Sequence, residues 1–356
     1  MGMFDNNLRQ AIEICIERRT PFCLYSLPLS DSSPVFFANP SRQPVPGKRR
    51  FFIGKWNESS DNFLYIDEEM NESEIIKSSP TESSSTRNAE ESFKSSSKEQ
   101  YIENLTLLIK DIRNKDAEKV VFSRTADFIH PFHSDDIIEL AEKVFFEYTY
   151  AFRFLYLTPE TGMWIGATPE LLVDFNQTDQ TVKTYAIAGT RPSGQSSEWS
   201  KKNIDEQLYV ISHIRNCLKE LEVNIVEGPT TTLHAGTIEH IATPFTGTFK
   251  SLKPKNYGYH VIDVLNPTPA LCGHPKEPAL QLIEKYETHK RDCYGGVIGV
   301  DDRNSIICFV NLRCARLMPD GAVLYAGGGI LAESDAEDEW NETERKLTTI
   351  GRFINP

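Results

Sequence analysis

The 356-residue sequence lacks any apolar run long enough to cross a membrane. Its longest apolar runs, such as residues 306–310, are far shorter than the roughly 18 residues that a membrane-spanning helix requires. The first ten residues, MGMFDNNLRQ, also lack the cationic and then apolar segments of a secretory signal. We therefore expect a cytoplasmic protein that does not associate with membranes.

Positive charge is scarce as well. The chain has 38 lysine and arginine residues against 51 aspartate and glutamate residues, a net charge of −13, and no lysine- or arginine-rich run offsets it locally. Nucleic acids and anionic membranes are bound through positive potential. The composition therefore argues against a nucleic-acid-binding protein, but it leaves room for a small anionic ligand held by a few local cations.

Cysteine patterns that mark disulfide frameworks or zinc sites are also missing. The seven cysteines form an odd set without a C-x-x-C pair and without histidines at zinc-finger spacing. Reduced, buried thiols in a cytosolic protein are the ordinary explanation for such a set. We assign no cysteine as a nucleophile or a metal ligand.

One segment is poor in large apolar residues. Residues 67–98 are rich in serine, glutamate and lysine, so they cannot bury enough surface to offset the entropy of ordering them. The rest of the chain shows no other linker. We predict one domain over residues 1–356, interrupted by a flexible insert at about 67–98.

Strand and helix patterns alternate after this insert. We predict strands at 119–124, 162–175, 183–188, 305–317 and 322–330, and helices at about 99–113, 135–146, 203–221, 276–289 and 335–350. Before the insert, residues 36–37 and 51–56 have the character of short strands. Strands that arrive in pairs between helices favour an α+β fold with antiparallel sheets over a parallel βαβ series.

The helix predicted at 203–221 places a glutamate in an informative position. Ile204 and Leu208 share its aliphatic face with residues 211, 218 and 221, whereas Glu206 lies on the opposite side. From the pattern alone, Glu206 faces either solvent or a second, polar interior.

The last predicted helix starts at a capping-box pattern, with Ser334 as the cap and Glu337 three residues later. Glu339, Glu342 and Lys346 then fall on one face of this helix. Taken alone, this spacing predicts a solvated acidic face with one ion pair.

Nine runs combine glycine or proline turns with charged groups beside apolar strands, the usual way in which loops carry function. In chain order they are KVVFSR (119–124), IGATPELLV (165–173), AIAGTRPSG (186–194), KNIDEQLYV (202–210), IEHIATPFTG (238–247), NPTPALCGHPK (266–276), RDCYGGVIG (291–299), FVNLRCARL (309–317) and YAGGGILAESDAEDEWNETERK (325–346). Together they resemble the chorismate-utilising enzymes, the family of isochorismate, salicylate, anthranilate and aminodeoxychorismate synthases. The resemblance is strongest over residues 119–350, and the first hundred residues match nothing specific.

This resemblance implies a fold of two stacked antiparallel β-sheets with helices outside. It also implies a Mg²⁺-dependent enzyme whose substrate is chorismate, a small molecule with two carboxylates. Mg²⁺ prefers oxygen ligands and usually keeps several waters, so few protein carboxylates suffice. By the resemblance, Glu206 and Glu342 are metal-binding, and Glu339 is a further metal-binding residue that can act through water.

The resemblance further implies which residues act on the substrate. Lys119 occupies the position of the general base in family members that add water at C2 of chorismate. A lysine serves as a base near neutral pH only where its environment disfavours the charged form, so this role requires Lys119 to face a dry pocket. Glu170 occupies the position of the general acid that protonates the departing C4 hydroxyl. The product of this pair is isochorismate.

The remaining substrate contacts also follow from the resemblance. Arg313 is the expected partner of a substrate carboxylate, because its planar guanidinium binds carboxylates through two parallel hydrogen bonds. The family places a histidine near the C4 hydroxyl, and here it is His240. The other predicted substrate-binding residues are Gly189, Thr190, Thr243, Ala270, Leu271, Tyr294, Gly327, Gly329 and Lys346. Asp292 stands where the family commonly has glycine, a change that a left-handed backbone tolerates less well.

Several alternatives remain. Aminodeoxychorismate synthases typically carry lysine where this chain has Ala188, which argues against that activity. The segment at 266–273 has the isochorismate-synthase form, with Ala270 and Leu271 at the ring pocket. The first alternative is a salicylate synthase, which also eliminates pyruvate; an ammonia-dependent synthase component and a non-catalytic chorismate-binding protein follow. We expect no obligatory protein partner. The sequence does not separate menaquinone from siderophore biosynthesis as the pathway served.

Overall fold

The computed structural model describes residues 3–79, 95–194, 198–235 and 238–354. The helices are α1 (Asn6–Arg18), α2 (Glu72–Lys77), α3 (Lys98–Arg113), α4 (Ser134–Glu147), α5 (Lys201–Glu220), α6 (Tyr257–Leu265), α7 (Lys276–Tyr286) and α8 (Ala336–Ile354), with a 3₁₀ turn at Ser60–Asn62. No helix among these residues is long and apolar enough to span a membrane. All seven cysteines are buried and free of disulfides, as the sequence predicts.

The strands form two antiparallel sheets. The first sheet has the order β13 (Gly273–His274), β5 (Lys119–Ile129), β17 (Gly321–Ile330), β16 (Cys314–Met318), β7 (Gly162–Thr168), β6 (Phe152–Thr158), β1 (Phe22–Ser26) and β2 (Val35–Ala38). The second sheet has the order β10 (Val223–Glu227), β12 (Ile238–Phe249), β9 (Thr181–Pro192), β8 (Leu171–Asn176), β15 (Ser305–Val310), β14 (Val297–Asp301), β3 (Arg50–Gly54) and β4 (Leu64–Asp67), and β11 (Thr231–Ala235) pairs with β12.

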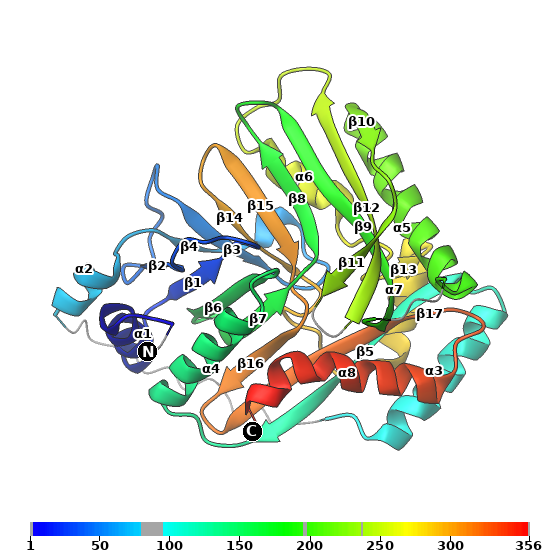
Figure 1. Ribbon diagram of the computed structural model, residues 1–356, viewed down its shortest axis with the longest axis horizontal. Helices are drawn as coiled ribbons and strands as arrows, with labels where there is room; N and C mark the ends of the chain where they lie inside the picture. Colours follow the sequence, from blue (N-terminus) through cyan, green and yellow to red (C-terminus); the bar gives the residue numbers. More distant parts are fainter. Residues whose placement is uncertain (1–2, 80–94, 195–197, 236–237, 355–356) are drawn as a thin grey trace.

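The two sheets stack on each other, and helices cover their outer faces (Figure 1). Aromatic side chains from both sheets, including Phe51, Tyr156, Trp164 and Phe309, form the core between them. Helices α1, α4 and α8 pack on the outer face of the first sheet, and α5 and α6 pack on the second. The predicted α+β architecture of stacked antiparallel sheets with external helices is therefore confirmed.

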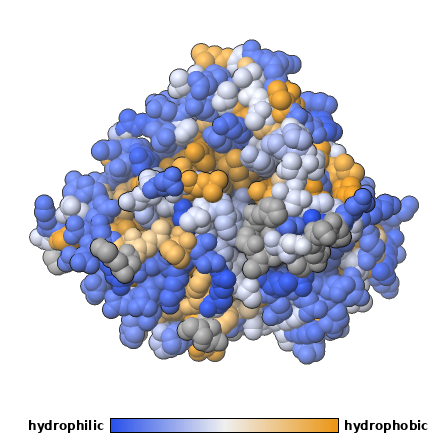
Figure 2. Space-filling view, viewed as in Figure 1, coloured by the Kyte–Doolittle hydropathy of each residue, from blue (hydrophilic) through white to orange (hydrophobic). Residues whose placement is uncertain are grey.

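The outward surface of these helices is polar. Figure 2 shows hydrophilic residues over most of the face seen in Figure 1, including the lower right where α3 and α8 lie. Along α8, Leu347 and Ile350 point into the core, whereas Glu344 and Arg345 are exposed. This division fits an amphipathic helix that buries one stripe.

Two predicted strands are wrong in the same informative way. Residues 162–175 and 305–317 were each predicted as one strand, but each divides into two strands that belong to different sheets: β7 and β8, and β15 and β16. The first breaks at Pro169, which lacks the N–H group that a ladder requires. The second breaks at Arg313, whose backbone is left-handed with φ 49°. Both chain segments thus cross from one sheet to the other.

The segment predicted as a flexible insert contains a short helix near its start. Asn71 caps helix α2 in a capping box with Glu74, and Ile75 is buried, so a short helix forms despite the polar composition. Helix α3 then begins at Lys98. Residues 80–94, the greater part of the predicted insert, lie outside the described residues.

Details of the two glutamate-bearing helices also differ from prediction. Ile204 and Leu208, predicted on the aliphatic face, are 46% and 52% exposed. Gln207 is buried instead, and its amide donates hydrogen bonds to the carbonyl of Ala186 and the hydroxyl of Thr243. At the start of α8 the cap is not Ser334. The carboxylate of Asp335 accepts the N–H groups of residues 337 and 338, whereas Ser334 accepts the N–H of residue 331.

Candidate functional site

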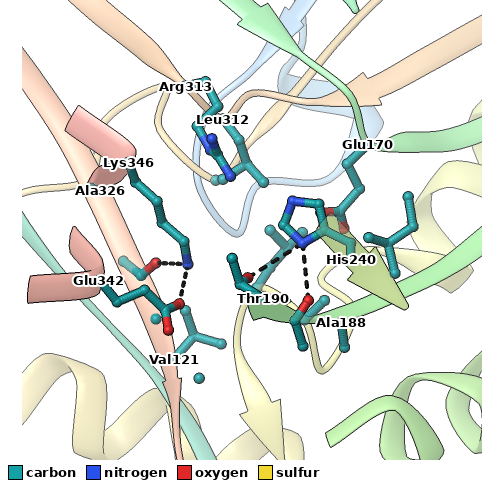
Figure 3. A pocket seen from close by; sticks show the side chains of 18 of the residues that line it. Val121, Glu170, Ala188, Thr190, His240, Leu312, Arg313, Ala326, Glu342 and Lys346 are labelled. Atoms are coloured by element: carbon teal, nitrogen blue, oxygen red, sulfur yellow. Dashed lines mark hydrogen bonds and ion pairs between the residues drawn. The ribbon is translucent and has the colours of Figure 1, made fainter. Parts of the chain in front are cut away.

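A cavity opens where the two sheet-crossing segments meet the start of α5, strand β17 and helix α8 (Figure 3). Thirteen of the sixteen residues predicted as site residues line this cavity: Glu170, Gly189, Thr190, Glu206, His240, Ala270, Leu271, Tyr294, Arg313, Gly327, Gly329, Glu342 and Lys346. Lys119 and Glu339 contact lining residues from behind. Thr243 is the exception. It is fully buried, and its hydroxyl bonds to Gln207 and Thr230 instead.

The crossing from β7 to β8 positions Glu170. The hydroxyl of Thr168 donates to the carbonyl of Val310 at 2.6 Å, and the N–H of Val310 donates to the carbonyl of Glu170 at 3.0 Å, so the two crossings are tied together. Burial raises the pKa of the Glu170 carboxyl to about 7, although Lys119, Lys346 and Arg313 oppose this rise. Near neutral pH this group can therefore both hold and release a proton.

The crossing from β15 to β16 positions Arg313. Its left-handed backbone is uncommon for a residue other than glycine, and the N–H of Ala167 bonds to its carbonyl at 3.1 Å. Within the described part of the chain its guanidinium forms no ion pair with an acidic side chain, and its closest bond is to the hydroxyl of Thr349 at 3.4 Å. An arginine without a carboxylate in a cavity is a ready site for an anion.

A β-bulge positions His240. In the pairing of β9 with β12, His240 lies opposite Thr190 and the next residue lies opposite Ala188, so Gly189 is the extra residue, with φ 66°. The carbonyl of Gly189 lies 3.0 Å from His240 Nδ1, and burial and Arg313 lower the pKa of this imidazole to about 3. The ring is thus neutral, with Nδ1 donating and Nε2 left as an acceptor.

Strand β17 lets the acidic side chains approach the backbone. A Cβ atom on Gly329 would lie 2.1 Å from Glu206 Oε1 and 2.9 Å from Lys119 Cε, so any other residue would displace both. On Gly328 it would lie 3.1 Å from Glu339 Oε2 and 3.6 Å from Glu342 Oε1. The glycine run therefore gathers carboxylates from α5 and α8 around one stretch of strand.

Each of these three carboxylates is paired with a lysine. Lys119 is fully buried, and its Nζ lies 2.8 Å from Glu206 Oε1 without the alignment of a hydrogen bond. Lys202 pairs with Glu339, which is 3% exposed. The ammonium of Lys346 donates to Glu342 at 2.7 Å and to the carbonyl of Gly327 at 2.8 Å. Lys119 is thus shielded from solvent, but its charged form has a carboxylate partner in Glu206.

The pKa values of the two α8 carboxyls move in opposite directions. Burial raises the pKa of Glu339, and the neighbouring Glu342 raises it further. Burial opposes ionisation of Glu342 as well, but Lys346, Lys202 and Arg345 together outweigh burial and lower the pKa of Glu342. One carboxylate of this pair is therefore firmly ionised.

These oxygens suit Mg²⁺ in donor type, and the three carboxylates from two helices flank one backbone segment. Across the described residues, however, no three acidic, histidine or cysteine side chains converge closely enough to hold an ion. Each of the three carboxylates faces a lysine instead.

We call Glu170, His240 and Arg313 the unpaired wall of the cavity. The paired wall consists of Glu206, Glu339 and Glu342 with their partners Lys119, Lys202 and Lys346. Figure 3 shows Glu170 and His240 on one side of the cavity and Glu342 and Lys346 on the other. The cavity thus combines an anion-binding arginine and a proton-exchanging carboxyl with a cluster of oxygen donors.

Several lining residues were not predicted from the sequence. Lys202 precedes Glu206 by one helical turn, so the helical spacing could have found it. Arg291 is the first residue of the RDCYGGVIG motif. It is buried, forms two hydrogen bonds to the carboxylate of Glu287, and donates to the carbonyls of Val121 and Leu271. This arginine therefore fixes the cavity wall and is not available to a ligand.

Tyr294 follows Arg291 and is 4% exposed; its ring stacks on Tyr325 with centroids 5.5 Å apart. Asp292, the departure from the family pattern, does occupy a left-handed conformation, with φ 52°. Its carbonyl accepts the N–H of Trp56 at 2.7 Å, and Arg316 pairs with its carboxylate. Aspartate adopts this conformation more readily than most residues, so the turn is kept.

Comparisons with known proteins agree with this geometry. The model of a family described as chorismate binding enzyme matches residues 50–355. Isochorismate synthase 2, chloroplastic, of Arabidopsis thaliana is 31% identical over 265 residues, which cover 71% of this chain and 46% of that protein. Anthranilate synthase component 1 of Saccharolobus solfataricus is 30% identical over 210 residues, 56% of this chain and 49% of that protein. The chain thus spans about half the length of these relatives.

Among solved structures, the menaquinone-specific isochorismate synthase MenF of Escherichia coli superposes with a TM-score of 0.75 at 18% identity, over 99% of this chain and 92% of that one. This likeness shows the fold alone. The family model covers most of the chain, including every segment that builds the cavity. The chain belongs to the chorismate binding enzyme family.

Proposed function

We propose that this protein is an isochorismate synthase, an isomerase that converts chorismate to isochorismate with Mg²⁺ as cofactor. The observation that carries the proposal is a carboxyl with a pKa of about 7, Glu170, that lines a cavity behind which the fully buried Lys119 lies. A carboxyl with this pKa suits general acid catalysis near neutral pH, and the lysine is the proposed base. The sequence identities to an isochorismate synthase and to an anthranilate synthase are 31% and 30%. The choice between these two activities therefore depends on the residues of the site.

In this proposal Lys119 accepts a proton from a water molecule as its oxygen bonds to C2 of the substrate. The ring double bonds shift, the C4–oxygen bond breaks, and Glu170 donates a proton so that the C4 hydroxyl leaves as water. Each turnover thus consumes one water and releases one. The two groups then exchange their protons with solvent to restore the starting state.

The other cavity residues hold the substrate. Arg313 has no acidic partner among the described residues, so it binds a substrate carboxylate, and Lys346 stands beside it as a second cation. The neutral His240 accepts a hydrogen bond from the C4 hydroxyl at Nε2, while Ala270 and Leu271 contact the substrate ring. Backbone amides at Gly189, Gly327 and Gly329, with Thr190 and Tyr294, complete the contacts.

Glu206, Glu339 and Glu342 would hold the metal, which when bound supplies positive charge for a substrate carboxylate. The proposal also includes a cytoplasmic enzyme without an obligatory protein partner. The proposed reaction, chorismate to isochorismate, is common to menaquinone and siderophore biosynthesis. All of these parts rest on the sequence features given above.

The test is an assay of the purified protein with chorismate and Mg²⁺, with products separated by chromatography and pyruvate measured in the same tube. Isochorismate in equilibrium with chorismate, without pyruvate, is the expected result. Salicylate with pyruvate would assign the protein as a salicylate synthase instead, and an aminated product on adding ammonia would assign an ammonia-dependent synthase. Absence of any conversion would refute the proposed chemistry.

A further inference from the structure

Lys202 differs from the other two lysines of the paired wall in its greater exposure to solvent. It lies in the first turn of α5, one helical turn before Glu206, and its side chain lines the cavity while remaining 28% exposed. Lys119 is enclosed behind Gly329, and Lys346 is held by both a carboxylate and a carbonyl. Among the described residues, Lys202 donates a side-chain hydrogen bond to Glu339 alone.

The charge around Lys202 is that of a cation site. Its burial would lower the pKa of its ammonium, but Glu339, then Glu342 and Glu206, together raise it. Lys202 therefore interacts with all three carboxylates that the proposed function assigns to the metal. The carboxylate of Glu339 is almost wholly buried, so without a cationic partner it would be costly to keep ionised.

Binding of an ammonium and a divalent ion to the same carboxylate is energetically unfavourable, because like charges a few ångströms apart repel strongly in a partly buried site. With its lysine partner in place, Glu339 does not combine with Glu206 and Glu342 into a compact ligand set. The lysine's partial exposure gives its ammonium a route to solvent.

We propose that Lys202 is the internal counter-ion of the metal site: its ammonium neutralises Glu339 in the metal-free protein and moves toward solvent when Glu339 turns to a bound Mg²⁺. This inference rests on the proposed function for the identity of the ion. It goes beyond that function by making Lys202 a competitor that sets the affinity for Mg²⁺. A lysine with a purely structural role would stabilise the fold without weakening metal binding.

The test is calorimetric titration of the metal-free full chain with Mg²⁺ for the wild type, Lys202→Met and Lys202→Arg. Lys202→Met should bind Mg²⁺ about tenfold more tightly, because a repelling charge is gone while the side chain keeps its length. Lys202→Arg should stay near wild type. Lys201→Met, at the exposed residue immediately before, is the matched control and should also stay near wild type.

Melting temperatures supply a second readout. Without Mg²⁺, Lys202→Met should melt below the wild type because Glu339 has lost its partner, and saturating Mg²⁺ should raise its melting temperature more than that of the wild type. Wild-type or weaker Mg²⁺ affinity in Lys202→Met would overturn the inference, even if the wild type makes isochorismate. Tighter binding in a protein that makes no isochorismate would instead overturn the proposed reaction and leave the counter-ion role standing. A wild type that does not bind Mg²⁺ at all would refute both.

Discussion

The two walls of the cavity treat charge in opposite ways. On the unpaired wall, neither Glu170 nor Arg313 forms an ion pair with another described residue, and His240 is held neutral. On the paired wall, Glu206, Glu339 and Glu342 each have a lysine at ion-pair distance. Both walls are partly buried, so the difference is not one of exposure.

This difference separates two tasks. A buried charge without a partner is costly, so such a group is retained where a ligand supplies the partner or where the group can stay neutral. The unpaired wall therefore fits contact with an anionic substrate and proton exchange. Burying a paired charge costs less free energy, and a divalent cation can replace the lysine as the partner of a carboxylate. The paired wall therefore fits a metal site.

The largest effect is expected at Lys119, which belongs to the paired wall but is proposed to act on the substrate. Lys119→Ala should lower kcat by about 10²–10⁴-fold, the range for loss of a general acid or base, with Mg²⁺ and chorismate binding largely retained. Steady-state kinetics and binding titrations measure these values. Lys183→Ala, at an exposed lysine of β9, is the control and should keep full activity. Full activity in Lys119→Ala would rule out the proposed base.

The next effect concerns Glu170 and pH. A general acid must be protonated, so kcat/KM should fall as the pH rises through about 7, the raised pKa of this carboxyl. Glu170→Gln should lose about 10²-fold or more in kcat, and its remaining activity should no longer show this alkaline decline. Rate measurements between pH 6 and 9 on both proteins make the comparison. An unchanged alkaline limb in the variant would assign that limb to another group.

Arg313 should affect binding more than turnover. Arg313→Gln removes a charge-assisted contact, which should raise the KM for chorismate by about 10- to 100-fold. The control is Arg215→Gln, at an exposed arginine paired with Glu227, where the KM should not change. An equal, small effect in both variants would mean that the substrate carboxylate binds elsewhere.

The smallest effect is expected at Thr243, which was predicted to bind substrate but lies behind Gln207. Thr243→Val should lower the free energy of unfolding by about 1 kcal/mol, because a buried hydrogen bond is lost, and should leave the KM unchanged. Thr190→Val, at a lining residue, should raise the KM instead. Chemical denaturation and steady-state kinetics separate the two. A raised KM in Thr243→Val would restore its predicted contact with substrate.

Local sequence patterns predicted the long amphipathic helices well. The helices at 98–113, 134–147 and 276–286 match prediction to within a few residues, because long amphipathic periods leave little choice. Helices α1, α2 and α6 were not predicted, and neither were the strands β1, β4, β6, β10, β11, β12, β13 and β14. Where strands change sheet, the deciding features are a proline and a left-handed arginine inside otherwise continuous apolar patterns, which periodicity does not register.

For the site, the motifs and the family resemblance supplied most lining residues, but not their partners. Lys202 and Glu339 are 137 positions apart, and their contact depends on how α5 and α8 meet over the glycines of β17. The pairing that distinguishes the two walls is therefore a property of the tertiary structure. Helical spacing alone predicted a solvated acidic face on α8, whereas Glu339 is buried.

The most direct test of the proposed chemistry follows the oxygen atom. Chorismate is incubated with the protein and Mg²⁺ in H₂¹⁸O, and the isochorismate formed is analysed by mass spectrometry. If Lys119 activates solvent water at C2 while the C4 hydroxyl leaves, each isochorismate molecule carries one ¹⁸O, and the Lys119→Ala protein yields almost none. Isochorismate that forms rapidly without the label would mean that the hydroxyl moves within the substrate, and it would contradict the roles assigned to both walls.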